Sequence, residues 1–354
     1  MKASIITMTC TYNYGATLQA FALQTYIENL GHSCNIINHM GWSGHRTVLT
    51  DKLSKDTILK MPYKKALEIG YSRFEAFYYN RMHMTKRYAT IKELYENPPD
   101  SDVFITGSDQ VWNPRDLRKE FYLDFVPAVA KKISYAASIG VPAIMDDKKE
   151  IIRELLKGFQ KISVRESSAK DNIQHLTDIE VSKNCDPVFL IGQDEWRKVE
   201  SPINGLPDDY ILCYMIYKPK WINSWLKQVK RKTGKKVIFM GLNGFRPVEC
   251  DKYIRCAGPE EFLWLIDHAS CVVSSSFHGI AFSVLFGKPL VAMPDPPRPD
   301  RINNLLSLFE LHDRILYENK TNGIFTWYDY CNIERIIKTE QNKTKTYFLS
   351  TFSK

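Results

Sequence analysis

The stretch that decides the fold is residues 3–39, "ASIITMTCTYNYGATLQAFALQTYIENLGHSCNIINH". It opens with a short β-rich run, and a pattern follows that places Leu18, Ala22 and Tyr26 at helical spacing. The helical pattern stops at Gly31, and a second β-rich run occupies residues 33–39. A strand, a helix and a strand in this order predict a βαβ unit with a parallel sheet.

The same alternation continues along the chain and predicts two α/β domains. The first series resumes in residues 102–108 and 131–138 and ends in the strand and helix of residues 161–173. A second series begins near residue 208 and continues to a helix that starts near His278. We therefore expect two Rossmann-like domains with mainly parallel sheets.

A polar, turn-rich segment lies between the two series and sets the expected domain boundary. The predicted domains are residues 1–195, in which residues 41–100 form a helical excursion, and residues 205–327. The C-terminal segment 328–354 no longer shows the alternating strand and helix patterns of the second domain, so we expect it to cross back to the first domain.

Composition excludes several classes of protein. A chain of 354 residues, 44% hydrophobic and 25% charged, is typical of a globular protein with more than one domain. No apolar run approaches the roughly 18 residues of a membrane helix, and the N-terminus turns polar too early for a signal peptide. The expected location is therefore the cytoplasm, at the inner face of the cell membrane if the protein contacts lipid.

The cysteine pattern and the net charge limit which metals and macromolecules the protein is expected to bind. The eight cysteines form no CxxC pair, which disfavours a zinc site and a disulfide framework. The net charge of +8 fits an anionic substrate or a basic patch that faces a membrane, and equally a lysine-rich surface without a partner. Basic residues are scattered and no groove-reading motif appears, so we expect no nucleic-acid partner.

A helix predicted near residues 219–236 has one apolar face. Trp221, Trp225 and Val229 share this face, while Lys227 and Arg231 extend away from it. Such a helix either contacts anionic lipid at a membrane surface or packs on the sheet of a Rossmann-like domain. The second reading is favoured, because that domain needs an apolar helix face.

Candidate binding residues gather where strands end and helices begin. Ligands of open α/β sheets collect at such junctions, since helix N–H groups and the helix dipole attract anions. The catalytic candidates are Arg165 and His278, and the candidates for substrate binding are Asn13, Gly15, Ser108, Asp109, Gln110, Asn113, Ser275, Ser276 and Gly279.

Of the first two junctions, the one at residues 13–15 suits a close backbone contact with a ligand, and the one at residues 108–113 suits a sugar. Asn13 and Gly15 fit a tight turn that brings N–H groups to a ligand, or simply the start of a helix. The polar cluster of residues 108–113 fits sugar hydroxyls, with Trp112 stacking on a sugar face. Its alternative is an Asx-turn beside a buried tryptophan.

Two further junctions carry ionisable side chains. Arg165 ends a strand, where its guanidinium either grips phosphate or carboxylate bidentately or pairs with Glu166. His278 stands in the first turn of a helix, after serines that cap the helix or bind an anion. A histidine there can donate to phosphate or exchange a proton near neutral pH.

Four stretches, in this order and spacing, carry a family resemblance: "TYNYGATLQAFALQ" (11–24), "DVFITGSDQVWNP" (102–114), "SVRESS" (163–168) and "SSFHGIAFSVLFGKPLV" (275–291). The chain resembles the polysaccharide pyruvyl transferase family. The resemblance implies a fold similar to the GT-B glycosyltransferases, with the active site in the interdomain cleft. It also implies transfer of pyruvate from phosphoenolpyruvate to two hydroxyls of a sugar, which gives a cyclic ketal in a cell-surface polysaccharide.

Carried over position by position, the family histidine falls on His278, and the family arginine falls on Ser276. A neutral hydroxyl in place of a cation removes a charge-assisted hydrogen bond worth roughly 1.5–3 kcal/mol. Either another cation, such as Arg165 or Arg301, holds the donor, or the substrate differs.

The expected partners are phosphoenolpyruvate and a sugar or lipid-linked glycan acceptor. We expect no cofactor, because no GxGxxG is present, and no metal, because ligand-type side chains do not cluster at ligand spacing. Two alternatives stay open: a GT-B-like glycosyltransferase that uses a nucleotide sugar, and a sugar- or nucleotide-binding protein without chemistry.

Overall fold

The computed structural model describes residues 1–39, 61–241, 249–295, 299–317 and 327–353. By their contacts these residues form two compact units. The first holds the described parts of residues 1–43, 78–191 and 334–354, and the second holds those of residues 44–77 and 192–333. The main division therefore lies between Ile191 and Gly192.

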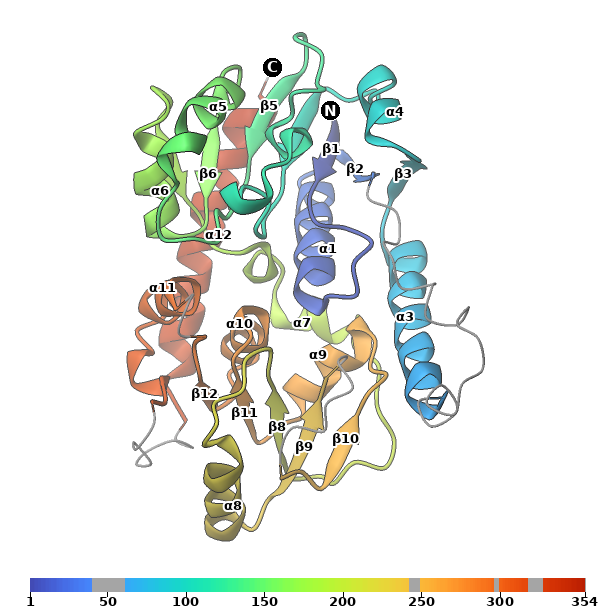
Figure 1. The fold of residues 1–354 in the computed structure, drawn as a ribbon, viewed down its shortest axis with the longest axis vertical. Helices are drawn as coiled ribbons and strands as arrows, with labels where there is room; N and C mark the ends of the chain where they lie inside the picture. The colour runs from blue at the N-terminus through green and yellow to red at the C-terminus, as the bar shows by residue number, and fades with distance from the viewer. Residues whose placement is uncertain (40–60, 242–248, 296–298, 318–326, 354) are drawn as a thin grey trace. The chain divides into compact units, whose positions relative to one another are not determined.

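The first unit contains a parallel sheet in the order β3-β2-β1-β4-β5 (Figure 1). Its strands are β1 (Lys2–Ile6), β2 (Ser33–Asn38), β3 (Met84–Arg87), β4 (Val103–Thr106) and β5 (Lys131–Ser134). A parallel pair, β6 (Ile162–Val164) and β7 (Val181–Lys183), continues beside β5 through isolated bridges such as Ile133 to Lys161. The strand order reverses at β1, which is the point where doubly wound sheets open a ligand crevice.

Helices complete the βαβ units of this sheet. They are α1 (Tyr14–Asn29), α4 (Ile91–Glu96), α5 (Asp146–Leu156) and α6 (Ser167–Gln174), with short 3₁₀ turns η2 (Pro114–Asp116), η3 (Lys119–Tyr122) and η4 (Pro187–Phe189). Leu18 and Ala22 of α1 are fully buried, as the helical pattern predicts, whereas Tyr26, the third residue of that pattern, is half-buried.

The second unit contains a parallel sheet in the order β10-β9-β8-β11-β12 (Figure 1). Its strands are β8 (Tyr210–Tyr214), β9 (Lys236–Met240), β10 (Lys252–Ile254), β11 (Cys271–Ser274) and β12 (Leu290–Ala292). The remaining elements are α7 (Gln193–Arg197), α8 (Ile222–Thr233), α9 (Pro259–Asp267), α10 (Phe277–Leu285), α11 (Asp300–Leu308) and η5 (His312–Arg314).

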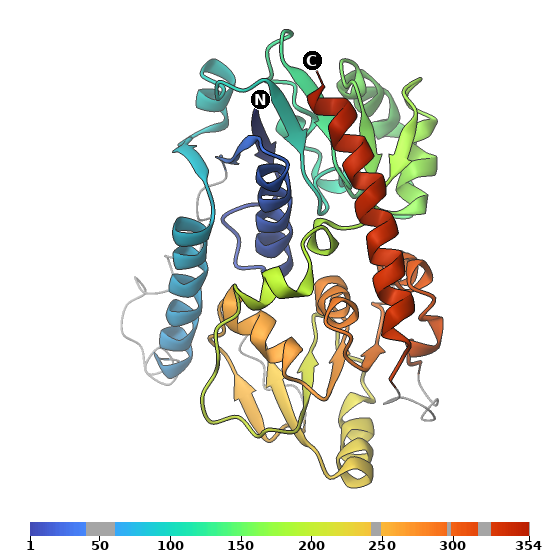
Figure 2. The ribbon, with the colours of Figure 1, turned by 180° about the vertical axis from the view of Figure 1, so that it is seen from behind.

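Two helices take part in both units. In α3 (Met61–Arg81), residues up to Phe77 belong to the second unit and the remaining residues to the first. In α12 (Tyr330–Phe352), residues up to Ile333 belong to the second unit and the remaining residues to the first. Figure 2 shows α12 in red in front of the strands of the first unit, where Tyr347 donates to the Ser134 carbonyl at 2.7 Å. Lys131 donates to the Thr351 and Ser353 carbonyls at 2.9 Å each and so caps the C-terminal end of α12.

The predicted fold class of two Rossmann-like α/β units with parallel sheets is confirmed. The sequence missed β3, which lies inside the expected helical excursion, and the short strands β10 and β12. β3 and β10 carry lysine or arginine among only three or four residues, and β12 lies in the same apolar run as α10, so none of the three shows a strand pattern of its own. The part of the excursion in residues 41–60 lies outside the described residues.

The apolar face of α8 packs into the core of the second unit. Ile222, Trp225, Leu226 and Val229 are buried there among residues of β8, β9 and β11. This agrees with the prediction that the helix packs in the core, while on its other side Lys230 pairs with Asp251 and Lys227 with Glu249. Within the described ranges, no helix combines the length and the apolar character needed to cross a bilayer.

One buried histidine gives the first unit a pH-dependent stability. His39 follows β2, is 5% exposed, and meets the Phe121 ring edge-on at 5.5 Å. Burial lowers the pKa of His39 from 6.5 to about 4. The unfolded chain therefore gains a proton first as the pH falls, and stability declines between pH 6.5 and about 4.

We expect wild type to lose about 2 kcal/mol more stability than His39→Gln between pH 7.5 and pH 5. Urea unfolding at both pH values measures this difference. Equal losses in the two proteins would show that His39 is not held neutral by the fold.

Candidate functional site

In the second unit, the chain passes from β11 into α10 through three serines that bind backbone groups. Ser274 Oγ donates to the Tyr214 carbonyl at 2.7 Å and accepts from the Ser276 N–H at 3.0 Å. Ser275 Oγ accepts from the N–H groups of Ile216 and Tyr217 at 2.9 and 2.8 Å. These bonds fasten the end of β8 to the start of α10.

Ser276 is the N-cap of α10. Its hydroxyl accepts from the Gly279 N–H at 3.4 Å, as an N-cap serine does. The same side chain forms a hydrogen bond with the Tyr214 phenol. Burial raises the pKa of Tyr214 to about 12, and this hydrogen bond partly opposes that rise. Ser275 and Ser276, predicted as anion ligands, thus already have backbone and side-chain partners in the structure.

Gly279 allows α10 to approach the sheet. A Cβ at this position would lie 2.5 Å from Ser274 Oγ and 2.9 Å from Cδ1 of Tyr214. Both distances are too short for a side chain, so the helix starts this close to β8 only with glycine here. The structure assigns Gly279 a packing role.

His278 lies in the first turn of α10 and is 7% exposed. Its ring meets the Phe277 ring edge-on at 5.0 Å. The α10 dipole adds positive potential at this turn. Arg301 stands in the first turn of α11, which packs against α10, so both residues lie in the same unit.

In the first unit, Arg165 is buried between two carboxylates. Its Nε lies 2.9 Å from Glu166 Oε1 and its Nη1 lies 2.7 Å from Asp186 Oδ2. Burial lowers the pKa of Arg165, but Glu166, Asp186 and Asp109 outweigh it and raise this pKa above its usual value. Arg165 is therefore part of a buried ion cluster, as in the salt-bridge alternative.

Ser108 joins this cluster to the first strand. Its hydroxyl donates to Asp186 Oδ2 at 3.2 Å and accepts from Arg165 Nη1 at 3.4 Å. Its carbonyl accepts from the Thr7 hydroxyl at 2.7 Å, and Thr7 accepts from Gln19 Nε2 at 3.0 Å. A buried network thus links the carboxyl ends of β1, β4 and β6.

Residues 109–113 form a turn with a strained aspartate. Asp109 has a φ of 77°, and its side chain accepts from the Gln110 N–H at 2.9 Å. The Gln110 side chain fills the space above Gly140, where a Cβ would lie 2.3 Å from it. Asn113 caps η2 by accepting from the Arg115 N–H at 3.0 Å.

Trp112 is a core residue. It is fully buried, stacks on Tyr122 at 5.2 Å, and donates from Nε1 to the Phe121 carbonyl at 3.0 Å. The expectation that it stacks on a sugar is wrong, because both its ring and its N–H are occupied inside the unit. The alternative reading, a turn beside a buried tryptophan, describes the structure.

The β1–α1 junction places Asn13 at the N-cap of α1. Asn13 Oδ1 accepts from the N–H groups of Gly15 and Ala16 at 3.0 and 3.3 Å. Sequence reasoning missed two neighbours, Thr9 and Gln19, whose buried Oγ1 and Oε1 atoms have no hydrogen-bond partner among the described residues. Periodicity gives no signal for such atoms, because it does not show where side chains end.

One trio of metal-type ligands occurs within the described ranges: Glu200, Asp267 and His268. Arg197 Nε lies 2.8 Å and Lys288 Nζ lies 3.5 Å from Asp267 oxygens. These two cations offset the charge of Asp267, and burial raises the pKa of Glu200, which favours its neutral form, so the group gives no support to a metal site. Independence from metal stays a prediction.

The polysaccharide pyruvyl transferase family model matches residues 13–295 of the chain. The chain belongs to this family. The matched range contains all four junctions and His278, whereas Arg301 lies beyond it. Membership in this family makes the chain a transferase.

Solved structures show similarity in fold. The chain is similar to UDP-GlcNAc 2-epimerase from Methanocaldococcus jannaschii, at 13% identity over 96% of this chain and 99% of that chain, with a TM-score of 0.50. The structure of UDP-GlcNAc 2-epimerase from Neisseria meningitidis bound to UDP-GlcNAc has 11% identity over 98% and 93%, with a TM-score of 0.49. An alpha-glucosyltransferase in complex with UDP and DNA has 9% identity over 97% and 90%, with a TM-score of 0.49.

At 13% identity the first structure supports similarity in fold alone. No protein with a curated description matches the chain.

The Arg165 cluster gives a prediction about stability. Removing the cation leaves two buried carboxylates without compensation, so Arg165→Ala is expected to lower the free energy of unfolding by about 3–5 kcal/mol. Chemical unfolding measures this change. Arg153→Ala, an exposed arginine paired with Glu150 on the surface, is the matched control and should leave stability nearly unchanged.

Neutralising both partners should rescue the fold. Arg165→Met combined with Glu166→Gln and Asp186→Asn removes all three charges and is expected to recover most of the lost stability. An Arg165→Ala protein as stable as wild type, but weak in binding phosphoenolpyruvate, would instead show that Arg165 is a donor ligand.

Proposed function

We propose that this member of the family transfers pyruvate from phosphoenolpyruvate to two hydroxyls of a sugar in a cell-surface glycan precursor, with His278 as the proton donor. The observation that supports this proposal is the placement of His278. It stands buried in the first turn of α10, at the carboxyl end of β11, next to the glycine that brings the helix onto the sheet.

The chemistry needs a proton donor close to concentrated negative charge. His278 gives a proton to the methylene carbon of phosphoenolpyruvate, and one sugar hydroxyl adds to the neighbouring carbon. A second hydroxyl displaces phosphate, which leaves with the electron pair of its C–O bond. Of the two hydroxyl protons, one balances the proton that His278 gave, and the other leaves with phosphate, so the products are a cyclic ketal and inorganic phosphate.

The phosphate of phosphoenolpyruvate needs a cation to bind it, because this chain lacks the family arginine. Ser276 occupies that position and is used as an N-cap, and Arg165 is held by two carboxylates in the first unit. Arg301 is in the second unit, on a helix packed against α10, so we assign the donor's charge to Arg301 and the α10 dipole. Arg165 stays in the proposal as a positioning residue that holds strand ends together.

The acceptor follows from the family. We assign it to a sugar or lipid-linked glycan precursor, and we place the reaction in the cytoplasm, at the inner face of the membrane when the acceptor carries a lipid. Asp109, Gln110 and Asn113 remain proposed contacts for acceptor hydroxyls, because the turn that carries them follows the carboxyl end of β4.

The prediction concerns turnover. Replacing His278 with alanine should lower kcat by about 10²–10⁴-fold, the range typical of a lost general acid. Phosphate release from phosphoenolpyruvate in the presence of glycan precursors measures this rate, and circular dichroism checks that the variant folds.

The matched control is His312→Ala, which removes an exposed histidine of the same unit and should keep the wild-type rate. A folded His278→Ala protein with near-normal turnover would reduce His278 to a packing role. A thermal shift caused by nucleotide sugars and not by phosphoenolpyruvate would replace the proposal with glycosyl transfer.

A further inference from the structure

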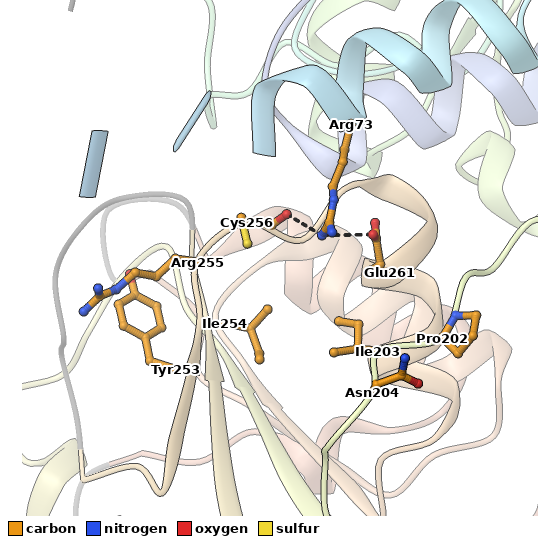
Figure 3. A pocket seen from close by; sticks show the side chains of 9 residues that line it. All are labelled: Arg73, Pro202, Ile203, Asn204, Tyr253, Ile254, Arg255, Cys256 and Glu261. Atoms are coloured by element: carbon orange, nitrogen blue, oxygen red, sulfur yellow. Dashed lines mark hydrogen bonds and ion pairs between the residues drawn. The ribbon is translucent and has the colours of Figure 1, made fainter. Parts of the chain in front are cut away.

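A cavity of about 590 Å³ opens in the second unit, at the carboxyl end of the edge strand β10, and the proposed reaction does not use it. In its wall, Arg73 Nη1 lies 2.9 Å from Glu261 Oε1 and donates to the Cys256 carbonyl at 2.8 Å, as the dashed lines in Figure 3 show. Figure 3 also shows the Arg255 guanidinium on the opposite side of β10 from the apolar floor at Ile254. Arg73 and Glu261 therefore satisfy each other, and the cavity identifies no class of ligand.

The outer face of α12 offers charges that are not satisfied in this way. Arg335, Lys338, Asn342, Lys345 and Leu349 follow one another at intervals of three and four residues, so they form one row along the helix. All of them are exposed. Figure 2 shows α12 in front of the strands of the first unit, and no other element of that unit lies in front of it. The row is about 21 Å long.

The two carboxylates of α12 stand at the margin of this row. Glu340 points to the side of the helix that is turned toward the first unit, where its carboxylate lies 3.7 Å from Lys343 Nζ. Glu334 is exposed in the first turn, four residues before Lys338, but the two side chains form no ion pair in the structure. The row itself therefore contains cations, an amide and a leucine, and no carboxylate.

The lysines of the row differ from the other basic residues on the surface of this unit. In α5, Lys148, Lys149 and Arg153 each lie next to a carboxylate of the same helix. Lys338 and Lys345 have no ion pair with any residue that the structure describes. Their charge is therefore available to a partner, whereas the charge of α5 is already neutralised.

Two further cations lie beside the C-terminal half of α12. Lys161 Nζ lies 3.1 Å from the Tyr347 carbonyl, and Lys131 Nζ lies 2.9 Å from the Thr351 carbonyl. Burial lowers the pKa of Lys161, and the positive charge of Lys131 lowers it further. The potential at this end of the helix is therefore positive, and here Leu349 exposes 54% of its surface.

We propose that the outer face of α12 binds the surface of an anionic lipid bilayer. The face has no groove for a partner of fixed shape, and two of its three cations are lysines, which are point charges on flexible stems. Such charges suit headgroups that move in the plane of a membrane, and an exposed leucine suits the apolar layer beneath them. The inference goes beyond the proposed reaction and does not rest on it.

The test is co-sedimentation of the full chain with phosphatidylcholine vesicles, with and without an equal part of phosphatidylglycerol. Wild type should bind the anionic vesicles and leave the neutral ones. Arg335→Gln, Lys338→Gln and Lys345→Gln together should weaken binding by about 100-fold, since each cation near an anionic membrane contributes about fivefold. Raising the salt concentration from about 0.1 M to about 1 M should release wild type, because the Debye length falls from about 10 Å to about 3 Å.

The matched control combines Lys148→Gln, Lys149→Gln and Arg153→Gln, which removes the same charge from α5 of the same unit. Because these cations are paired on the surface, this variant should bind vesicles as wild type does. Circular dichroism checks that both triple variants fold.

A change of opposite sign separates the row from net charge alone. Glu334→Gln removes the exposed carboxylate before Lys338 and should strengthen binding to the anionic vesicles by about fivefold.

Equal vesicle binding by wild type and the α12 triple variant overturns the proposal. So does failure of wild type to bind anionic vesicles while the same variant loses binding to RNA, which would make the partner a nucleic acid.

The lipid contact and the pyruvyl transfer fail separately. If vesicle binding depends on the row and phosphoenolpyruvate is not consumed, the lipid contact stands and pyruvyl transfer fails. If phosphoenolpyruvate is consumed and the α12 triple variant binds vesicles as wild type does, pyruvyl transfer stands and the lipid contact fails.

Discussion

The ion cluster of Arg165 with Glu166 and Asp186 is the interaction on which the first unit depends. The three side chains are almost entirely removed from solvent, and Ser108 extends the cluster to Thr7 and Gln19. Isolated charges at this depth are strongly unfavourable, so each member is stable only while the others are in place. The carboxyl ends of β1, β4 and β6 are thereby fixed to one another. The edge where ligands of such sheets bind is built around this cluster, which explains why an arginine at a strand end serves the scaffold.

In the second unit, neutral groups hold the strand ends in place. Three serines and one glycine join β8 and β11 to α10, and no charge is needed to hold that junction. His278 is left as the ionisable side chain of the helix start, inside a frame of hydroxyls and backbone amides. This contrast is why the account assigns chemistry to His278 and support to Arg165.

The sequence could predict the main alternation of strands and helices, because five-residue strands and long helices show their periods. It located both junctions correctly at His278 and Arg165. It could not predict that Arg165 meets Asp186, since this pairing depends on β7 returning beside β6. Trp112 was misread for a related reason: its partners Phe121 and Tyr122 lie on a turn whose path no local pattern reveals. The cavity at β10 combines residues near 73, 203 and 255, which only the folded chain brings together.

The central claim is that phosphoenolpyruvate is the donor although Ser276 replaces the family arginine. The most direct measurement follows phosphoenolpyruvate labelled with ¹³C at its second carbon, mixed with the protein, free and phosphorylated sugars, and nucleotide sugars. The account predicts a new quaternary ketal carbon on a sugar and the release of one phosphate for each ketal formed. Unchanged phosphoenolpyruvate in a mixture where a nucleotide sugar is consumed and a glycosylated product appears would contradict it.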